Sequence, residues 1–427
     1  MGTQTVHKLL IVDTAALSQE WEWGDLTFRA VETVFPALTC TVQASFRTAS
    51  APASHGMVSN GVYLRQLARP MFWEQPANLV AGKRIWHDLR ACGGKVAMLF
   101  WQQSMGEEAD IVLTPAPIHK HHGGMIMDCS DRPAGLYDRL CRQIGKPFNL
   151  RHYWGPMARP AVGNWIIDAT LAVLREESLA PDLCLTYLPT LDYDLQRHDP
   201  TGPRARAALN VLERQLARLL NAAREMGYEV LVFGDYAIRP VTGAVFPNRA
   251  LAEAGLFKTR SVRDMLYPDL PGSRAFAMVD HQIAHVYVAD RGDIEPTRDA
   301  LSRLPGVEEL MDRPRRRDFG IDHANSGELV AVAAADRWFA YPWWHEKRQA
   351  PDYAGHVDIH NKPGYDPCEL RWGWPPGSVS RDTSRIRGSH GRAGSANTVT
   401  WAASIDLGGV RSLLELSAAT REWLNEG

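Results

Sequence analysis

The chain has 427 residues, of which 45% are hydrophobic, and its 47 basic and 49 acidic residues give a formal net charge of -2. This length and apolar content provide for one large core or two ordinary ones. The near balance of charge excludes a global electrostatic signature for a nucleic-acid polymer or an anionic membrane, so we expect any binding to be local.

The N-terminus leads almost directly into a strand, without the basic and apolar regions of a secretory signal, and no apolar run approaches the ~20 residues of a membrane span. Six cysteines are scattered without a Cys-x-x-Cys pair, which predicts neither a disulfide framework nor a thiolate zinc site. We therefore expect a soluble, cytoplasmic protein with reduced cysteines. Its oligomeric state is not indicated.

Residues 8–13 form a short apolar run that ends in Asp13, the pattern of a buried parallel strand that places a carboxylate at the sheet's carboxyl edge. Ligands bind at this edge in open α/β folds. Residues 39–48 contain no Gly or Pro and predict a helix, with Thr39 near its N-terminus, where an anion is favoured. The alternative is that Thr39 is an N-cap and Asp13 a strand-end acid without further function.

Further strand-like runs cover 95–100, 182–188, 229–234 and 284–288. Leucines at helical spacing between the second and third of these runs predict a helix, so the order is that of βαβ units. Carboxylates follow two of the runs, namely Asp192 with Asp194, and Asp235. Together with Asp13, acids from three strands are expected to converge on one edge of a mostly parallel sheet.

The segment 102–160 differs in character and is interpreted as an inserted cap or loop region. The region 312–400 is rich in Arg, Trp, Pro and Gly, which favours irregular backbone. We find no internal repeat and no low-complexity linker, so residues 1–427 are expected to form a single catalytic domain.

Two weak histidine signals accompany these acids. Asp194 and His198 are four residues apart and would share one face of a helical turn, and His390 lies in a loop beside glycine. Alone, each is equally explained by a surface ion pair or an ordinary loop histidine.

Taken in order, these motifs resemble the type I phosphodiesterase/nucleotide pyrophosphatase family of the alkaline phosphatase superfamily, including its phosphonoacetate hydrolase-like branch, over residues 8 to 392. In that family a strand ends in aspartate, Pro-x-x-Thr supplies a nucleophile, and His-Gly and an asparagine follow. The matching positions are Asp13, Pro36 with Thr39, His55-Gly56 and Asn60. The resemblance implies a three-layer αβα sandwich with a mostly parallel central sheet.

The resemblance also implies two divalent metal ions, with zinc as first choice and manganese as the alternative. Asp13, Asp235 and Thr39 would hold the first ion, and Asp194, His198 and His390 the second. Thr39 would attack phosphorus to form a phospho-threonine intermediate while Asn60 stabilises the phosphoryl oxygens. His55 is assigned a structural role.

The sequence departs from the family at one position. Where the family has Asp-His-Gly, with both side chains on the metal that holds the nucleophile, this chain has Asp235-Tyr236-Ala237. Three explanations are open. Tyr236 or a water molecule takes the place of the missing metal ligand, another histidine substitutes for it, or the site has lost one metal ion and with it full activity. His281 and His360 are the candidate substitutes, although an ordinary histidine explains either one as well.

The predicted function is a metal-dependent phosphodiesterase or nucleotide pyrophosphatase with a small-molecule phosphoester or nucleotide substrate. One alternative is a phosphonate or phosphomonoester hydrolase, in which Lys120, Lys362 or Arg387 would bind the additional charge. A second alternative is a degenerate protein that binds phosphate without turning over a substrate. The presence of Tyr236 where the family has histidine suggests this alternative.

Overall fold

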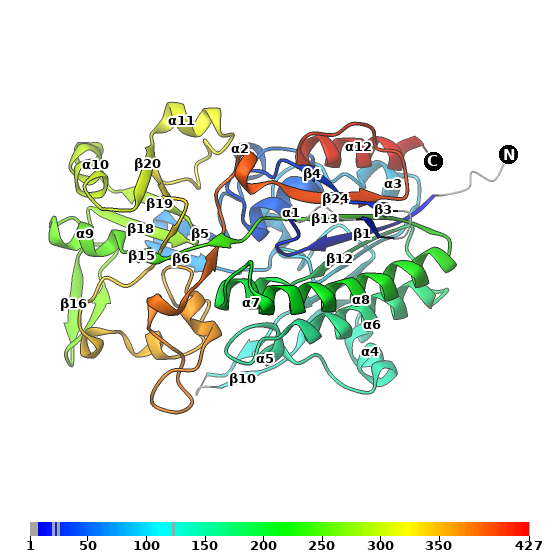
Figure 1. The fold of residues 1–427 in the computed structure, drawn as a ribbon, viewed down its shortest axis with the longest axis horizontal. Helices are drawn as coiled ribbons and strands as arrows, with labels where there is room; N and C mark the ends of the chain where they lie inside the picture. Colours follow the sequence, from blue (N-terminus) through cyan, green and yellow to red (C-terminus); the bar gives the residue numbers. More distant parts are fainter. Residues whose placement is uncertain (1–6, 19–21, 24–25, 122–123, 427) are drawn as a thin grey trace.

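A computed structural model describes residues 7–18, 22–23, 26–121 and 124–426. Figure 1 shows two lobes side by side, with the first and last described residues on the larger one. The larger lobe contains a central sheet between helices, and the smaller lobe, at the left of the view, contains a second sheet.

The larger lobe is built on an eight-stranded sheet. In spatial order its strands are β11 (Cys129–Arg132), β8 (Ile111–Pro115), β7 (Val96–Leu99), β12 (Leu183–Leu188), β1 (Lys8–Thr14), β13 (Tyr228–Gly234), β24 (Val399–Ala403) and β4 (Arg29–Val31). The five strands from β8 to β13 are mutually parallel, whereas β11, β24 and β4 each pair antiparallel with their neighbour.

Helices cover both faces of this sheet (Figure 1). One layer contains α4 (Leu136–Ile144), α6 (Gly163–Arg175) and α8 (Pro203–Glu225), and the other contains α1 (Thr39–Thr48), α3 (His87–Ala91) and α12 (Leu413–Glu426). Helix α8 begins with a proline and buries leucines at helical spacing, as the sequence pattern predicted. The predicted three-layer αβα sandwich with a mostly parallel sheet is confirmed.

The carboxyl ends of the three central strands lie level. Asp13 is in register with Tyr187 of β12 and Phe233 of β13. Strand β13 ends in Gly234, where a Cβ would lie 2.0 Å from the carbonyl oxygen of Leu17. Because only glycine permits this approach, β13 ends against the turn after β1, which brings Asp235 beside Asp13.

The smaller lobe contains a four-stranded antiparallel sheet with its own apolar core. Its strands, in spatial order, are β18 (Ala275–Asp280), β19 (Ile283–Val288), β21 (Leu329–Ala333) and β20 (Val307–Met311), and its helices are α9 (Pro247–Glu253), α10 (Ile294–Ser302) and α11 (Arg313–Asp318). The predicted run 284–288 is therefore a strand of this second sheet rather than of the βαβ core.

Short elements complete the fold. Two-stranded pairs are β2 (Glu22–Trp23) with β3 (Leu26–Thr27), β5 (Gly61–Leu64) with β6 (Arg69–Phe72), β9 (Ile118–His119) with β10 (Met125–Ile126), β14 (Arg239–Pro240) with β23 (Gly388–Ser389), β15 (Gly243–Val245) with β22 (Arg337–Phe339), and β16 (Thr259–Val262) with β17 (Met265–Pro268). Short helices are α2 (Pro52–His55), α5 (Leu150–Tyr153) and α7 (Asp192–Arg197). Between residues 347 and 385 the regular structure consists of single 3-10 turns, in line with the irregular backbone predicted there.

The segment 102–160, expected to be an inserted cap, contributes β8 and β11 to the main sheet and α4 to its helical layer. Its β9–β10 hairpin carries exposed side chains, and residues 122 and 123, within the same segment, lie outside the described residues. Among the described helices, none has the length and apolar content needed to cross a membrane.

Candidate functional site

Thr39 is the first residue of α1 and is almost completely buried. The residue before it, Leu38, has extended backbone, and no side chain among the described residues caps this helix. The N-terminal amides of α1 and its dipole therefore favour negative charge beside the Thr39 hydroxyl. This matches the helix start that the sequence predicted.

Asn60 lies against the first turn of α1. Its side-chain oxygen accepts a hydrogen bond from the Cys40 amide (3.0 Å), and its Nδ2 donates to Asp280 Oδ1 (3.2 Å). Asp280 also accepts from the Asn60 amide (2.8 Å) and from the Ser59 hydroxyl (2.7 Å). Because a carboxamide nitrogen carries two hydrogens, Asn60 Nδ2 has one N–H besides the one that it donates to Asp280.

Asp13 and Asp235 form a fully buried pair of carboxylates at the ends of adjacent strands. Gln43 Nε2 donates to Asp13 Oδ2 (2.7 Å), and the amides of Ala16 and Tyr236 donate to Asp235 Oδ1 (3.2 and 2.9 Å). The other oxygen of each acid, Asp13 Oδ1 and Asp235 Oδ2, is buried without a partner in the described part of the chain.

This arrangement changes the protonation of the two acids. Burial raises the pKa of Asp13 to about 8, although the Gln43 hydrogen bond acts in the opposite direction. Burial raises the pKa of Asp235 well above its usual value, and the charge of Asp13 raises it further. Near neutral pH the pair therefore retains a proton or requires a cation between its two free oxygens.

The Tyr236 hydroxyl has two polar neighbours, Asp192 and Thr39. The hydroxyl donates to Asp192 Oδ1 (2.9 Å), and burial raises its pKa well above the usual value, while the nearby Thr39 side chain acts in the opposite direction. Because a phenol has one hydrogen, which Asp192 receives, the Tyr236 oxygen can act toward Thr39 only as an acceptor. The three residues thus lie in the order Thr39, Tyr236, Asp192.

Asp192 is the first residue of α7 and is buried. Its Oδ1 accepts a second hydrogen bond from Gln196 Nε2 (2.8 Å), and the Gln196 side-chain oxygen accepts one from the Tyr365 hydroxyl (2.7 Å). Burial raises the pKa of Asp192, while the Gln196 hydrogen bond, the neighbouring His281 and the Tyr236 hydroxyl lower it. A buried carboxylate with a raised pKa is a stronger proton acceptor than a solvated one.

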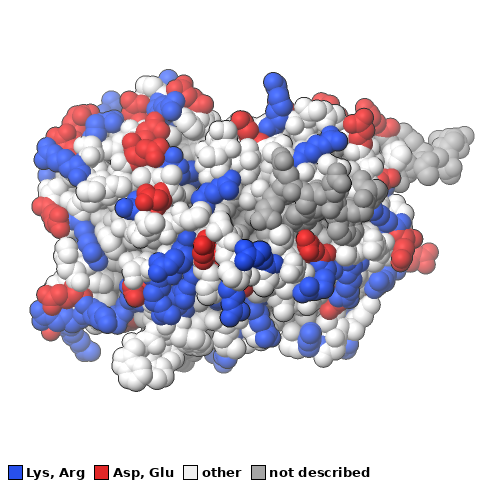
Figure 2. Space-filling model, viewed as in Figure 1, with Lys and Arg blue, Asp and Glu red and all other residues white. Residues whose placement is uncertain are grey.

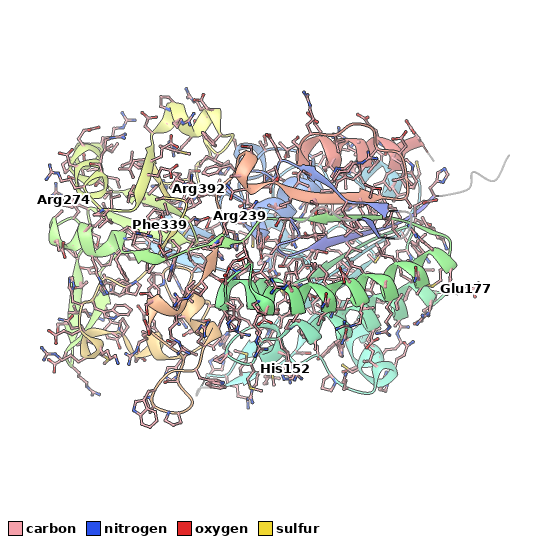
Figure 3. All side chains as sticks on the ribbon, in the orientation of Figure 1. His152, Glu177, Arg239, Arg274, Phe339 and Arg392 are labelled. Atoms are coloured by element: carbon pink, nitrogen blue, oxygen red, sulfur yellow. The ribbon has the colours of Figure 1, made fainter. Side chains whose placement is uncertain are left out.

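Four rings form a buried column beside this chain of hydrogen bonds. Tyr236 stacks on His390 at 3.5 Å between ring centroids and 3° between planes, His390 lies 3.7 Å from His281, and His281 stacks on Tyr365 at 3.7 Å. The column joins the two lobes, because His281 follows β18 and His390 follows β23, the partner of β14. Arg239 of β14, labelled in Figure 3, lies at the junction of the lobes.

Both histidines are fixed by hydrogen bonds. His390 Nδ1 donates to the carbonyl of Ala37 (2.8 Å), and burial lowers its pKa well below the usual value, with the nearby His281 acting in the same direction. His281 Nδ1 donates to Asp280 Oδ1 (2.7 Å), and its Nε2 is buried without a partner in the described part of the structure. His281 has a φ of 59°, a left-handed conformation that is uncommon for histidine and frequent at functional sites.

The structure therefore brings together seven of the predicted site residues and places four elsewhere. Those in the cluster are Asp13, Thr39, Asn60, Asp235, Tyr236, His281 and His390. Those with other contacts are Asp194, His198, His360 and Lys362.

The contacts of these four residues explain their positions. Asp194 lies 3.7 Å from Arg197, and His198 lines a surface pocket at the end of α7. His360 Nδ1 donates to the carbonyl of Phe72 (3.0 Å). Lys362 is buried and paired with Asp366 and Glu369 at 2.8 and 2.7 Å.

His55 also has a local role in the structure. Its Nδ1 accepts from the Met57 amide (3.1 Å), and its Nε2 donates to the Ser45 hydroxyl (2.9 Å). These bonds hold the turn after α1 against the helix, and they leave no ring nitrogen for a reaction.

The sequence reasoning missed Asp192 and Gln196 as site residues. Asp192 lies two positions before Asp194, and both follow β12. The spacing of four between Asp194 and His198 favoured the second acid, but α7 begins at Asp192, and the residue four positions after Asp192 is Gln196. The sequence feature that favours Asp192 over Asp194 is its position closer to the end of strand β12.

The donor set fits one cation and does not fit two. Asp192 Oδ1 already accepts two hydrogen bonds, a glutamine follows it at four residues, and the His390 ring lies flat against Tyr236. Within the described residues no three His, Cys, Asp or Glu side chains are arranged to share a metal ion. The free oxygens of Asp13 and Asp235 are hard oxygen ligands that suit a single ion.

Comparison with known proteins agrees with the fold. The family model for type I phosphodiesterase / nucleotide pyrophosphatase matches residues 13–366. No curated protein matches the sequence. The chain is similar to phosphonoacetate hydrolase from Sinorhizobium meliloti 1021 in complex with phosphonoformate, at 14% identity and a TM-score of 0.62, over 97% of this chain and 95% of that one.

It is also similar to human ectonucleotide pyrophosphatase / phosphodiesterase 5, at 12% identity and a TM-score of 0.58, over 98% of this chain and 95% of that one. The murine protein of the same name gives a TM-score of 0.55 at 12% identity, with the same coverage. At these identities the similarity establishes the fold, and the residues of the site must be assessed from their own geometry.

Proposed function

The chain belongs to the type I phosphodiesterase/nucleotide pyrophosphatase family, and we propose that it hydrolyses a phosphodiester or phosphoanhydride bond of a small molecule with Thr39 as the nucleophile. The observation that carries this proposal is the position of the Tyr236 hydroxyl, which donates to Asp192 and is close enough to the Thr39 side chain for that side chain to lower its pKa. It gives the nucleophile a proton acceptor at the position where the family motif has a metal-ligating histidine.

The substrate phosphoryl group lies at the N-terminus of α1. The remaining N–H of Asn60 and the helix dipole stabilise negative charge on the phosphoryl oxygens, and Asp280 holds Asn60 in place. Because Asp280 anchors both the backbone and the side chain of Asn60, the donor is positioned before the substrate binds.

In the first step the Thr39 oxygen forms a bond to phosphorus and the bond from phosphorus to the leaving oxygen breaks. The Thr39 proton passes to Tyr236, whose own proton passes to Asp192. In the second step a water oxygen forms a bond to phosphorus and the bond from phosphorus to the Thr39 oxygen breaks. Asp192 and Tyr236 return the proton to the Thr39 oxygen, and the proton that the water loses leaves with the phosphate product or passes to solvent. A phosphorylated Thr39 is the intermediate.

The family is generally metal-dependent. We propose that this chain holds one divalent cation, with Asp13, Asp235 and Thr39 as ligands, which would supply positive charge beside the nucleophile. The all-oxygen ligand set favours manganese over zinc. The place of a second ion is taken by the contacts among Tyr236, Gln196 and Asp192.

A diester is favoured over a monoester because the site offers little positive charge. Lys362, the buried cation predicted to bind a dianion, is already paired with Asp366 and Glu369. A phosphomonoester would bring two negative charges to a site whose ionisable groups are carboxylic acids, tyrosine and histidines, whereas a diester brings one.

The test is a substrate panel with manganese, containing bis-p-nitrophenyl phosphate, p-nitrophenyl phosphate and phosphonoacetate. We expect turnover of the diester to exceed that of the other two and to be lost in Thr39→Ala. A preference for the monoester or for phosphonoacetate would contradict the diester assignment.

A second candidate function is phosphate binding without turnover. It is supported by the two positions, Tyr236 and Gln196, at which neutral side chains stand near Asp192 in place of metal-ligating histidines. Binding of a phosphoester without any Thr39-dependent turnover across the panel would establish this function instead.

A further inference from the structure

A second basic site lies at the C-terminal end of α7, apart from Thr39. A surface pocket of about 370 Å³ is lined there by Arg197, His198, Asp199, Arg371, Arg385 and Arg387. Lys and Arg side chains gather in this region of the molecule in Figure 2, where α7 meets the orange segment of Figure 1. Neither Thr39 nor any other residue of the candidate active site lines this pocket.

The pocket carries a large excess of positive charge. Four guanidinium groups face one carboxylate, Asp199, whose Oδ1 accepts hydrogen bonds from the backbone amide and the hydroxyl of Thr201 (2.9 and 2.8 Å). Asp194 lies 3.7 Å from Arg197. Arg371, Arg385 and Arg387 form no ion pair with a carboxylate of the described residues.

Backbone contacts hold these three arginines without neutralising them. Arg371 donates to the main-chain carbonyl of Arg197, Arg385 to that of Trp372 (3.1 Å), and Arg387 to that of Ser384 (2.5 Å). Arg371 Nε is buried and has no partner in the described part of the chain.

The arginines also act on one another. Burial lowers the pKa of Arg371, and the charges of Arg385, Arg197 and Arg387 lower it further. Guanidinium groups keep their charge in proteins, so the cluster is electrostatically strained unless an anion lies among them.

The chain brings this cluster together from three segments. Arg197 ends α7, Arg371 follows the 3-10 turn Pro367–Leu370, and Arg385 ends the turn Thr383–Arg385. The Arg387 amide donates to the Gln196 carbonyl (3.0 Å), which ties the last segment to α7. Fixed guanidinium forks in a concave pocket are the geometry that recognises phosphate oxygens.

We propose that this pocket binds a phosphate group, as inorganic pyrophosphate or as the terminal phosphates of a nucleotide. Arg197, which lines the pocket at the end of α7, lies five residues after Asp192, or about 7.5 Å along the helix axis. The pocket is a second anion site in addition to the one at Thr39, and its occupancy does not depend on turnover at Thr39.

Isothermal titration calorimetry with inorganic pyrophosphate tests the proposal. We expect the wild type to bind with an affinity that falls as salt rises. The double variant Arg385→Gln/Arg387→Gln should lose one equivalent of binding, or weaken it at least tenfold. Asn60→Ala, which alters only the Thr39 site, should retain that equivalent.

The matched control is Arg303→Gln, because Arg303 is 80% exposed and lies at the end of α10 in the other lobe. It removes a positive charge without touching the pocket. Unchanged stoichiometry and affinity in the double variant would overturn the proposal, as would the absence of pyrophosphate binding by the wild type. A loss shown by Asn60→Ala alone would place the anion at Thr39 and overturn it as well.

Two further measurements distinguish the sources and guard against misfolding. Competition of ADP with pyrophosphate, lost in the double variant, would identify nucleotide phosphates as ligands, whereas binding of pyrophosphate alone would restrict the site to the free ion. If the double variant unfolds at a lower temperature than the wild type, the single variant Arg385→Gln replaces it, with the same expected weakening.

Discussion

The hydroxyl of Tyr236 donates a hydrogen bond to Asp192 Oδ1 over 2.9 Å. Both residues are buried, and the Thr39 side chain is near enough to the same hydroxyl to lower its pKa. A tyrosine therefore occupies the position where the family motif has a metal-ligating histidine, and it joins the nucleophile to a carboxylate. The predictions below follow from this contact and from the acids next to it.

Removing the Tyr236 hydroxyl should break the path for the Thr39 proton. We expect Tyr236→Phe to lower kcat about a hundredfold or more, within the range of general-base effects, with a small change in KM. Steady-state kinetics with bis-p-nitrophenyl phosphate measures both. Tyr193→Phe is the matched control, because the Tyr193 hydroxyl is buried without a partner among the described residues. Equal effects of the two changes would mean that the Tyr236 hydroxyl has no part in the reaction.

Asp192 and Asp194 give opposite predictions although they lie two residues apart. Asp192→Asn should remove most activity because it removes the proton acceptor, whereas Asp194→Asn should stay within about threefold of the wild type, since Asp194 only pairs with the partly exposed Arg197. The acid limb of the kcat/KM profile should report an apparent pKa above that of an ordinary aspartate, because burial raises the pKa of Asp192. A greater loss in Asp194→Asn would restore the original interpretation of the sequence.

Without metal, the protein should lose stability as pH rises. The pKa of Asp13 is about 8 in the folded protein against an ordinary 3.8, so between these values the folded state holds a proton that the unfolded state has released. The free energy of unfolding should therefore fall by up to about 1.4 kcal/mol per pH unit from pH ~4 to pH ~8. Urea unfolding in EDTA measures this slope, and Asp13→Asn should flatten it. An equal slope in wild type and variant would refute this assignment.

One manganese ion should bind per chain, and it should offset the loss of stability at rising pH. Near pH 8 the ion replaces the proton between Asp13 and Asp235, so saturating manganese should raise the thermal unfolding midpoint. Asp235→Asn should abolish this shift, while Asp192→Asn should retain it. Metal analysis after dialysis should give one equivalent per chain, and two tightly held equivalents would show that the second site is intact.

Asn60 should contribute to the transition state rather than to folding alone. Losing one donor to a developing charge costs about 10²- to 10³-fold in kcat, so Asn60→Ala should show a loss of this size. Ser59→Ala removes a neighbouring bond to the same Asp280 and serves as the structural control. Comparable losses in both variants would indicate that only the Asp280 network matters.

Much of this architecture could be predicted from local sequence. Apolar runs that end in acids identified the strands carrying Asp13 and Asp235, and the Gly- and Pro-free run from Thr39 identified α1, because burial and helix propensity act over a few residues. The strand at 284–288 has the same local pattern, yet it pairs in a second sheet, since strand partners are chosen by contacts distant in sequence.

For a related reason, the sequence does not single out Asp192 over Asp194. The choice between them depends on the residue at which α7 begins, and helix starts are uncertain by one or two positions in a sequence. The approach of His281 to His390 depends on how the two lobes pack, and these residues are over one hundred positions apart. Neither contact leaves a local signal.

The central claim is that Thr39 carries the phosphoryl group during turnover. Rapid quenching with acid during hydrolysis of bis-p-nitrophenyl phosphate, followed by mass spectrometry of the peptide that contains Thr39, tests it directly. The account predicts a p-nitrophenyl phosphoryl adduct on Thr39 in the wild type and a slower appearance of that adduct in Tyr236→Phe. Turnover without an adduct, which persists in Thr39→Ala, would contradict it.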